Sequence, residues 1–246
     1  MDGNSTVAQY FTARAVSYNR SSRWCNDAAL DALMLEMTAP GKGDCVLDVA
    51  CGTGLVSRIF HGGVSRVVGL DITPAMLEQA RAFTDETVLG SAEDMPFADQ
   101  CFDLVVCRQG IQFMDDRLAL RQMWRVLRPG GKVCVVALCA YGEEDRAEYF
   151  EVLRLRNPAR RNFYAFNDLE SLLRKTGFEQ VTVARHVSLE DVDGWSEHSA
   201  IDETRREAIR RVYRRASRRF LDLHAARFEG ERISDQMLFG VAVGIK

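Results

Sequence analysis

Several features that would assign this 246-residue chain to a common class of protein are missing. Its seven cysteines form no C-x-x-C pair, and its four histidines share no ligand-like spacing with them, so we expect no metal site. No apolar run is long enough to span a bilayer, and the polar N-terminus MDGNSTVAQYFTARA does not resemble a signal peptide. A net charge of −3 does not favour a nucleic-acid partner. The odd number of cysteines, most of them in apolar runs, indicates reduced, buried thiols in a cytoplasmic protein.

The chain instead shows apolar segments that alternate with helical patterns. Near-continuous apolar strands between helices indicate a parallel sheet covered on both faces. The sequence therefore predicts an α/β, Rossmann-like fold with a seven-stranded, mostly parallel sheet. The strands are expected at 45–50, 66–72, within 87–97, at 102–108, at 132–139, after Gly177 and at 236–246.

We expect residues 1–246 to form a single domain, because neither repeats nor low-complexity tracts interrupt the pattern. Residues 1–40 are interpreted as a helical N-terminal lid. The cofactor-binding core would follow at 41–140. The segments 141–166 and 193–230, the second of which is helical and rich in arginine, are interpreted as cap inserts.

Polar residues and glycines follow the predicted strands, which suggests a ligand site at their carboxyl ends. Asp48 precedes the turn that contains Gly52 and Gly54 and lets the backbone approach a ligand. Asp71 ends the second strand, where one carboxylate can accept hydrogen bonds from both hydroxyls of a ribose. Asp94 follows the third strand and could accept from an exocyclic amine. The site therefore suits a nucleoside.

The glycine turn does not fit a dinucleotide well. The stretch Gly52-Thr53-Gly54-Leu55-Val56-Ser57 lacks the third small residue of G-x-G-x-x-G/A. If Asp48 faces this turn, its carboxylate would repel a pyrophosphate and attract an amino group or a sulfonium. A nicotinamide dehydrogenase is therefore disfavoured.

Five stretches, VLDVACGTG, GLDIT, SAEDMPF, FDLVVCR and LRPGGKV, occur in an order that resembles the motifs of class I S-adenosylmethionine-dependent methyltransferases. They are most similar to the branch that includes the ubiquinone- and menaquinone-biosynthesis enzymes. The resemblance covers roughly residues 10–140 and, more loosely, 168–186 and 236–246. It implies S-adenosylmethionine as the cofactor, S-adenosylhomocysteine as its product, and an antiparallel final strand.

The resemblance also implies a set of cofactor-binding residues. Asp48 and the backbone of Ala50–Gly54 would hold the methionine moiety, Asp71 the ribose hydroxyls and Asp94 the adenine amino group. The full set is Tyr10, Arg14, Tyr18, Asp48, Ala50, Gly52, Gly54, Asp71, Ile72, Met76, Glu93, Asp94, Met95 and Arg108.

The other members of this set would complete the cofactor site. Ile72 and Met76 would lie against the adenine, with Glu93 and Met95 beside it. Arg108 would approach the methionine end through its backbone. The N-terminal residues would close over the cofactor; they are Tyr10, Arg14 and Tyr18.

Simpler interpretations stay open for several of these residues. Asp48 could cap the following helix, and Tyr10 and Tyr18 could serve only helix packing. The sequence identifies no general base. The candidates for catalysis are Gln109, Gln112, His198 and His224.

The expected function is in-line methyl transfer to the oxygen, carbon or nitrogen of a small, apolar or aromatic acceptor. The alternatives are an S-adenosylmethionine-binding enzyme of other chemistry, such as a cyclase or decarboxylase, and a non-catalytic binding subunit.

The eight arginines between 205 and 219 give this part of the chain a basic character. Residues 205–246 carry 11 basic and 5 acidic side chains, whereas residues 1–204 carry 21 and 30. This segment could be a cap helix paired with the acidic body, or a dock for an anionic, carrier-linked acceptor or an acidic membrane surface.

Overall fold

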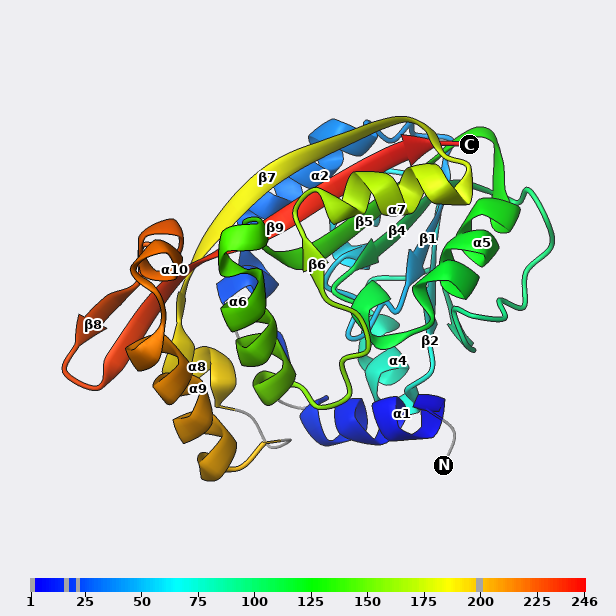
Figure 1. The fold of residues 1–246 in the computed structure, drawn as a ribbon. Helices are drawn as coiled ribbons and strands as arrows, with labels where there is room; N and C mark the ends of the chain where they lie inside the picture. The colour runs from blue at the N-terminus through cyan, green and yellow to red at the C-terminus, as the bar shows by residue number, and fades with distance from the viewer. Residues whose placement is uncertain (1–2, 16–17, 21–22, 198–200) are drawn as a thin grey trace.

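The computed structural model describes residues 3–15, 18–20, 23–197 and 201–246. Its centre is a sheet in which seven strands follow the order β3-β2-β1-β4-β5-β9-β7, with β6 paired to β5 and β8 paired to β9 (Figure 1). The strands are β1 Cys45–Val49, β2 Arg66–Asp71, β3 Glu86–Leu89, β4 Phe102–Arg108, β5 Leu127–Ala140, β6 Tyr164–Ala165, β7 Glu179–Asp191, β8 Arg227–Glu229 and β9 Arg232–Ile245.

The sheet is parallel except where β9 takes part. β9 pairs antiparallel with β5, β7 and β8, so the expected antiparallel final strand is confirmed. In the central strands, Asp48 lies opposite Gly69 of β2 and Val106 of β4. The strand order changes direction at β1, so the carboxyl ends of β1, β2 and β4 meet at one edge of the sheet. This edge is where a ligand is expected.

Helices cover both faces of the sheet (Figure 1). Successive strand residues face opposite ways: Val46 packs in one core with α2, and Leu47 packs in the other with α5 and α7. The helices are α1 Gly3–Arg14, α2 Ala28–Thr38, α3 Ser57–Phe60, α4 Pro74–Ala80, α5 Asp116–Val126, α6 Glu143–Arg156, α7 Asp168–Thr176, α8 Val192–Ser196, α9 Glu203–Arg215 and α10 Arg218–Leu223, with short 3₁₀ helices η1 Tyr18–Arg20, η2 Arg23–Asn26 and η3 Ile111–Phe113. The predicted Rossmann-like fold is confirmed.

Some predicted element bounds were wrong. The helix after β1 is a single turn, because the glycine turn occupies the residues before Ser57. α5 ends at Val126, and β5 begins at once at Leu127 rather than at the expected residue 132, with the Gly130 N–H donating to the Lys246 carbonyl. The segment 193–230 is not wholly helical, because β8 turns at Gly230, with φ +63°, and pairs with the start of β9.

A cap of α6, α8, α9 and α10 extends beyond one end of β7 and β9 (Figure 1). Its apolar side chains belong to the same core cluster as α2, which ties the cap to the sheet. All seven cysteines are free thiols, and five of them are buried. Among the described residues, no helix is both long and apolar enough to cross a membrane.

Candidate active site

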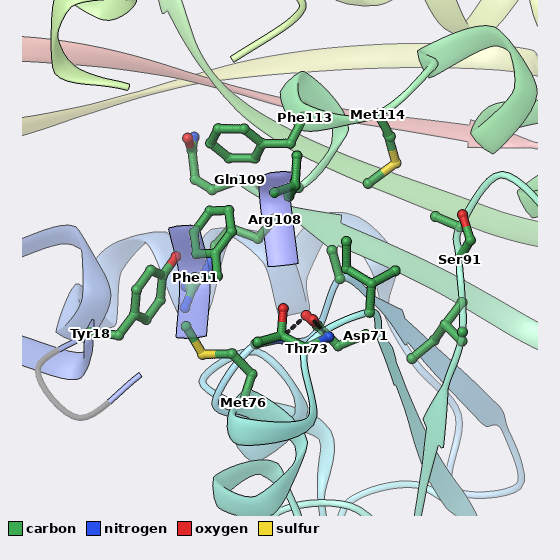
Figure 2. Close-up of a pocket in the computed structure, with 18 residues that line it drawn as sticks. Phe11, Tyr18, Asp71, Thr73, Met76, Ser91, Arg108, Gln109, Phe113 and Met114 are labelled. Carbon is green, nitrogen blue, oxygen red and sulfur yellow. Dashed lines mark hydrogen bonds between the residues drawn. The ribbon is translucent and has the colours of Figure 1, made fainter. Parts of the chain in front are cut away.

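A cavity of about 670 Å³, open to solvent, lies at the carboxyl ends of β1, β2 and β4. Figure 2 shows Phe11 and Tyr18 on one side of the cavity and Ser91 on the opposite side. The lining residues are Val7, Phe11, Tyr18, Ala50, Gly52, Leu70, Asp71, Ile72, Thr73, Met76, Gly90, Ser91, Ala92, Arg108, Gln109, Gly110, Phe113 and Met114.

Asp71 is the acidic residue in this wall. Its two carboxylate oxygens accept hydrogen bonds from the backbone N–H of Thr73 at 2.8 Å and of Gly52 at 2.9 Å. Burial raises the pKa of Asp71, and these backbone donors oppose that rise. Each oxygen has a second lone pair. The carboxylate is therefore a fixed acceptor that can take further hydrogen bonds from a hydroxyl-bearing ligand.

The two glycines of the turn have different roles. Gly52 has φ +56° and lines the cavity, and a Cβ added there would meet no atom within 4 Å. Gly54 has φ +82°, and a Cβ there would lie 3.0 Å from the Cα of Ala80 in α4. Gly54 is therefore required by its conformation and by helix packing, and it does not line the cavity.

Asp48 is buried behind the turn and is not part of the cavity lining. Its Oδ2 accepts a hydrogen bond from the Ser57 hydroxyl at 2.7 Å. Burial raises the pKa of Asp48 to about 7, although the Ser57 hydroxyl and the Arg108 charge act in the opposite direction. These contacts favour the simpler interpretation, in which Asp48 anchors the start of α3. Its contact with a ligand stays a prediction.

The remaining wall is largely apolar. Ile72 and Met76, which were expected against a ring, line the cavity, and Met114 comes to the same cavity from the segment after β4 (Figure 2). Phe11 of α1 packs edge-on against Phe113 of η3, with ring centroids 5.1 Å apart. This aromatic pair joins α1 to the core across the cavity.

Sequence reasoning missed several lining residues. Phe11 and Phe113 carry no motif, and only their shared neighbourhood in space brings them together. Gln109 and Gln112 were predicted near the site, and this prediction could have been extended to their neighbours Phe113 and Met114. The lining residues that were not predicted are Val7, Phe11, Leu70, Thr73, Gly90, Ser91, Ala92, Gly110, Phe113 and Met114.

Arg108 also lines the cavity, and its side chain is buried. One guanidinium nitrogen lies 2.7 Å from the carboxylate of Asp31 in α2, and the guanidinium lies 5.9 Å from the ring centre of Trp24. The ion pair holds the end of β4 against α2.

Several predicted cofactor residues lie outside this lining. Glu93 accepts hydrogen bonds from the backbone of Asp115 at 2.7 Å and from Arg161 at 3.1 Å, so it joins two loops. Asp94 is exposed. Met95 is buried in the core next to α5. Their contacts with a cofactor stay predictions.

Tyr10 and Arg14 belong to α1, and neither is part of the first cavity lining. The Arg14 guanidinium lies 5.4 Å from the ring centre of Tyr10 and 5.2 Å from that of Tyr18. Arg14 is buried and lines a second cavity. α1 and η1 therefore lie over the strand ends, and the Gln79 side chain of α4 donates to the Ala15 carbonyl at 2.8 Å. Their action as a lid stays a prediction.

The second cavity, of about 430 Å³ and also open to solvent, adjoins the first. The two share part of their walls, namely Phe11, Tyr18, Gln109 and Phe113. The remaining lining residues are Arg14, Trp24, Gln112, Leu138, Leu153, Arg156, Asn157, Arg160 and Trp195.

Two of the four catalytic candidates lie in these walls. Gln109 lines both cavities, and Gln112 lines the second and donates its amide to the Gln109 side chain at 2.9 Å. His198 lies outside the described residues. Their roles in catalysis stay predictions.

His224 lies away from both linings and is fully buried. Its Nδ1 lies 2.8 Å from Asp235 of β9, and its Nε2 lies 3.0 Å from Asp145 of α6. The Tyr213 hydroxyl of α9 donates to Asp235. His224, which follows α10, therefore joins α6 of the cap to β9 of the sheet; its role in catalysis stays a prediction.

The arginines of α9 and α10 are largely paired with acids of the cap itself. Arg210 contacts Asp193 at 2.6 Å and Glu203 at 2.7 Å, and Arg215 pairs with Glu151 of α6. This pattern favours the interpretation of 205–219 as cap helices with a solvated, internally paired face.

Comparison with known proteins finds similar chains. Residues 47–135 match the family described as "Methyltransferase domain". A malonyl-[acyl-carrier protein] O-methyltransferase of Erwinia billingiae is 32% identical over 161 residues, which cover 63% of this chain and 62% of that protein. The chain therefore spans less than two thirds of the length of this curated relative.

Solved structures share the fold. The YcgJ protein of Bacillus subtilis has a TM-score of 0.80 at 22% identity and covers 89% of this chain and 99% of its own. The [4+2]-cyclase SpnF has a TM-score of 0.58 at 20% identity and covers 89% of this chain and 80% of its own. At these identities the likeness concerns the fold alone. In its family match over residues 47–135, its motif order and its sheet topology, the chain is similar to the class I S-adenosylmethionine-dependent methyltransferases.

Proposed function

We propose that this chain binds S-adenosylmethionine in the first cavity and directs its methyl group to a small-molecule acceptor in the second. The observation that carries the proposal is Asp71, a carboxylate held by two backbone donors in a wall whose other side chains are largely apolar. A ribose diol can donate to its free lone pairs, and an adenine ring would lie against Ile72 and Met76, which line the same cavity.

The shared wall of the two cavities supports a transfer between them. S-adenosylmethionine, which Asp71, Ile72 and Met76 would hold, would supply a methyl group on a positively charged sulfur for displacement by the acceptor's electron pair, with S-adenosylhomocysteine as the leaving group. The chain's residues provide proximity and alignment, which can lower a barrier by roughly 7–11 kcal/mol. Phe11 and Phe113, which line both cavities, place apolar surface at the boundary between them.

The acceptor is proposed here only as a class. The Erwinia relative is named for O-methylation of a malonyl group on an acyl-carrier protein. We infer for this chain a small-molecule acceptor, apolar or aromatic in its body and free or carrier-linked. The aromatic lining of the second cavity supports this, since Trp24, Phe113 and Trp195 contribute to it.

We also infer how the chain is organised and where it works. Residues 1–246 would act as one domain, with α1 as a lid and α6 and α8–α10 as the cap. The seven free thiols support a cytoplasmic location, because reducing compartments keep cysteines unpaired.

Calorimetric titration with S-adenosylmethionine and S-adenosylhomocysteine tests the proposal. We expect wild type to bind both, and Asp71→Asn and Asp71→Ala to bind each at least tenfold more weakly, because the carboxylate that would accept the ribose hydrogen bonds is lost. Glu78→Ala is the matched control, since Glu78 is exposed on α4 and pairs with Arg81 at 3.0 Å. Equal binding by the wild type and the Asp71 variants would contradict the assigned site.

Product analysis then separates methyl transfer from other chemistry. A methyltransferase forms S-adenosylhomocysteine in step with methylated acceptor, whereas a cyclase or decarboxylase that binds the same cofactor does not consume it. The fold shared with SpnF makes this second assay necessary.

A further inference from the structure

The second cavity is rich in positive charge. Three arginines, Arg14, Arg156 and Arg160, line it, and none of the described residues in its lining is acidic. These arginines come from α1, from the end of α6 and from the loop that follows α6. We call this second cavity the cation pocket.

Arg156 is buried at the end of α6 and is held by neutral groups. Its Nε donates to the Trp195 carbonyl at 3.1 Å, and its guanidinium stacks 4.2 Å from the ring centre of Trp195. Its Nη2 has no hydrogen-bond partner among the described residues. Burial lowers the pKa of Arg156 to about 10, and the nearby charge of Arg14 acts in the same direction. The group is nevertheless charged at neutral pH.

Arg160 is also held by neutral groups. Its Nε donates to the Asn162 carbonyl at 2.9 Å, and its Nη2 donates to the Leu138 carbonyl at 3.2 Å. Its guanidinium lies 5.4 Å from the ring centre of Phe163. These contacts fix the guanidinium in place and leave its charge without a counter-ion in the part of the chain that the structure describes.

Glu190 is an acid whose charge interacts with Arg156, but its carboxylate oxygens already accept hydrogen bonds from other groups. It accepts hydrogen bonds from the backbone of Trp24 at 3.0 Å and of Arg23 at 3.1 Å, and from the Ser188 hydroxyl at 2.9 Å. It does not line the cation pocket. The pocket therefore keeps a net positive charge.

Hydrogen-bond donors that lack partners within the described residues also indicate a site for an anionic group. Three lining residues have such donors: Arg156 Nη2, Asn157 Nδ2 and Gln109 Nε2. One unpartnered acceptor, Gln112 Oε1, lies with them. Buried polar atoms in native proteins are normally paired, and a buried charge requires an opposite charge or hydrogen bonds. A carboxylate offers two oxygens and one negative charge, which matches this set of donors.

We propose that the cation pocket binds a carboxylate group of the methyl acceptor, with Arg156 and Asn157 donating to its oxygens and the acceptor's apolar body lying against the aromatic wall. This inference rests on the proposed function, because the pocket shares Gln109 and Phe113 with the cofactor cavity. The acceptor class is therefore a small carboxylic acid.

Paired probes test the inference without knowledge of the natural acceptor. The probes are acetate, butanoate, benzoate and 3-phenylpropanoate, each compared with its neutral amide. Binding is measured by ligand-observed NMR, with and without saturating S-adenosylhomocysteine. We expect at least one carboxylate to bind wild type tenfold or more tightly than its amide, and the preference to fall as salt rises.

Two variants and one control locate the preference. Arg156→Gln removes the charge, and Asn157→Asp replaces an amide donor by an acid while keeping the Oδ1 that accepts from Ala159 at 3.0 Å. Both should abolish the carboxylate preference and leave the affinity for S-adenosylhomocysteine within twofold of wild type. Arg121→Gln, at an exposed position on α5, should change neither. A thermal melt confirms that each variant is folded.

Three outcomes would overturn the inference. The first is that no carboxylate binds wild type better than its amide, and the second is that the preference survives in both pocket variants. The third is a large loss of S-adenosylmethionine affinity in Arg156→Gln, because the pocket would then hold the cofactor's own carboxylate. Failure of the proposed function gives a different result, because wild type would then not bind S-adenosylmethionine at all. The carboxylate and amide probes, titrated without cofactor, would still show whether the cation pocket prefers a carboxylate.

Discussion

The buried charge network around His224 makes a pH-dependent contribution to stability that can be measured. Burial disfavours the charged imidazole, but the carboxylates of Asp235 and Asp145 outweigh this effect and raise the pKa of His224 to about 9. Tyr213 donates to Asp235, and the ring of Phe220 stacks 4.1 Å from the imidazole. In the unfolded chain the pKa is about 6.5.

The raised pKa of His224 sets the direction in which stability changes with pH. A group with a raised pKa in the folded state contributes stability that is fully present below pH 6.5 and is lost as the pH rises through about 9. A shift of about 2.5 units corresponds to about 3 kcal/mol. Asp145 behaves in the opposite way: hydrogen bonds from His224 hold its pKa below the usual range despite burial, so its contribution is lost in acid.

Urea unfolding at several pH values tests this reasoning with His224→Gln. We expect wild type to lose about 3 kcal/mol of unfolding free energy between pH 6 and pH 9.5 relative to the variant. His61→Gln is the control, because His61 is exposed and lies 4.0 Å from Asp85. Parallel pH profiles for wild type and His224→Gln would refute the assignment of the charge to His224.

The remaining predictions concern the frame of the first cavity. Gly54→Ala should lower the unfolding free energy by about 2 kcal/mol, because φ is +82° and the new Cβ would lie 3.0 Å from Ala80 Cα; an unchanged denaturation midpoint would contradict this. Asp31→Asn should cost roughly 3 kcal/mol, since it leaves the buried guanidinium of Arg108 without its carboxylate. Denaturant unfolding of Asp44→Asn, at an acid of the neighbouring loop, is the comparison for that loss.

Local patterns were sufficient to predict the sheet and one edge of the site. Buried parallel strands need continuous apolar runs, and such runs at Leu104–Cys107 and Val133–Ala140 are recognisable without any knowledge of their neighbours. The acid that ends β2 was predicted in the wall of a cavity, and Asp71 lies there. The same reasoning placed Asp48 beside the ligand; the structure shows it accepting a hydrogen bond from Ser57, and its contact with a ligand stays a prediction.

The amino-acid sequence by itself determined the alternation of strands and helices, the glycine turn and the acid at the end of β2, because each depends on residues that are close together in the chain. Only the tertiary structure decided how α1, the end of α6 and the loop after β4 meet. Phe11 and Phe113 form an aromatic pair, and Arg14 and Arg156 line one pocket. No periodicity or spacing encodes these contacts, since they join segments about 100 or more residues apart whose packing depends on the whole core.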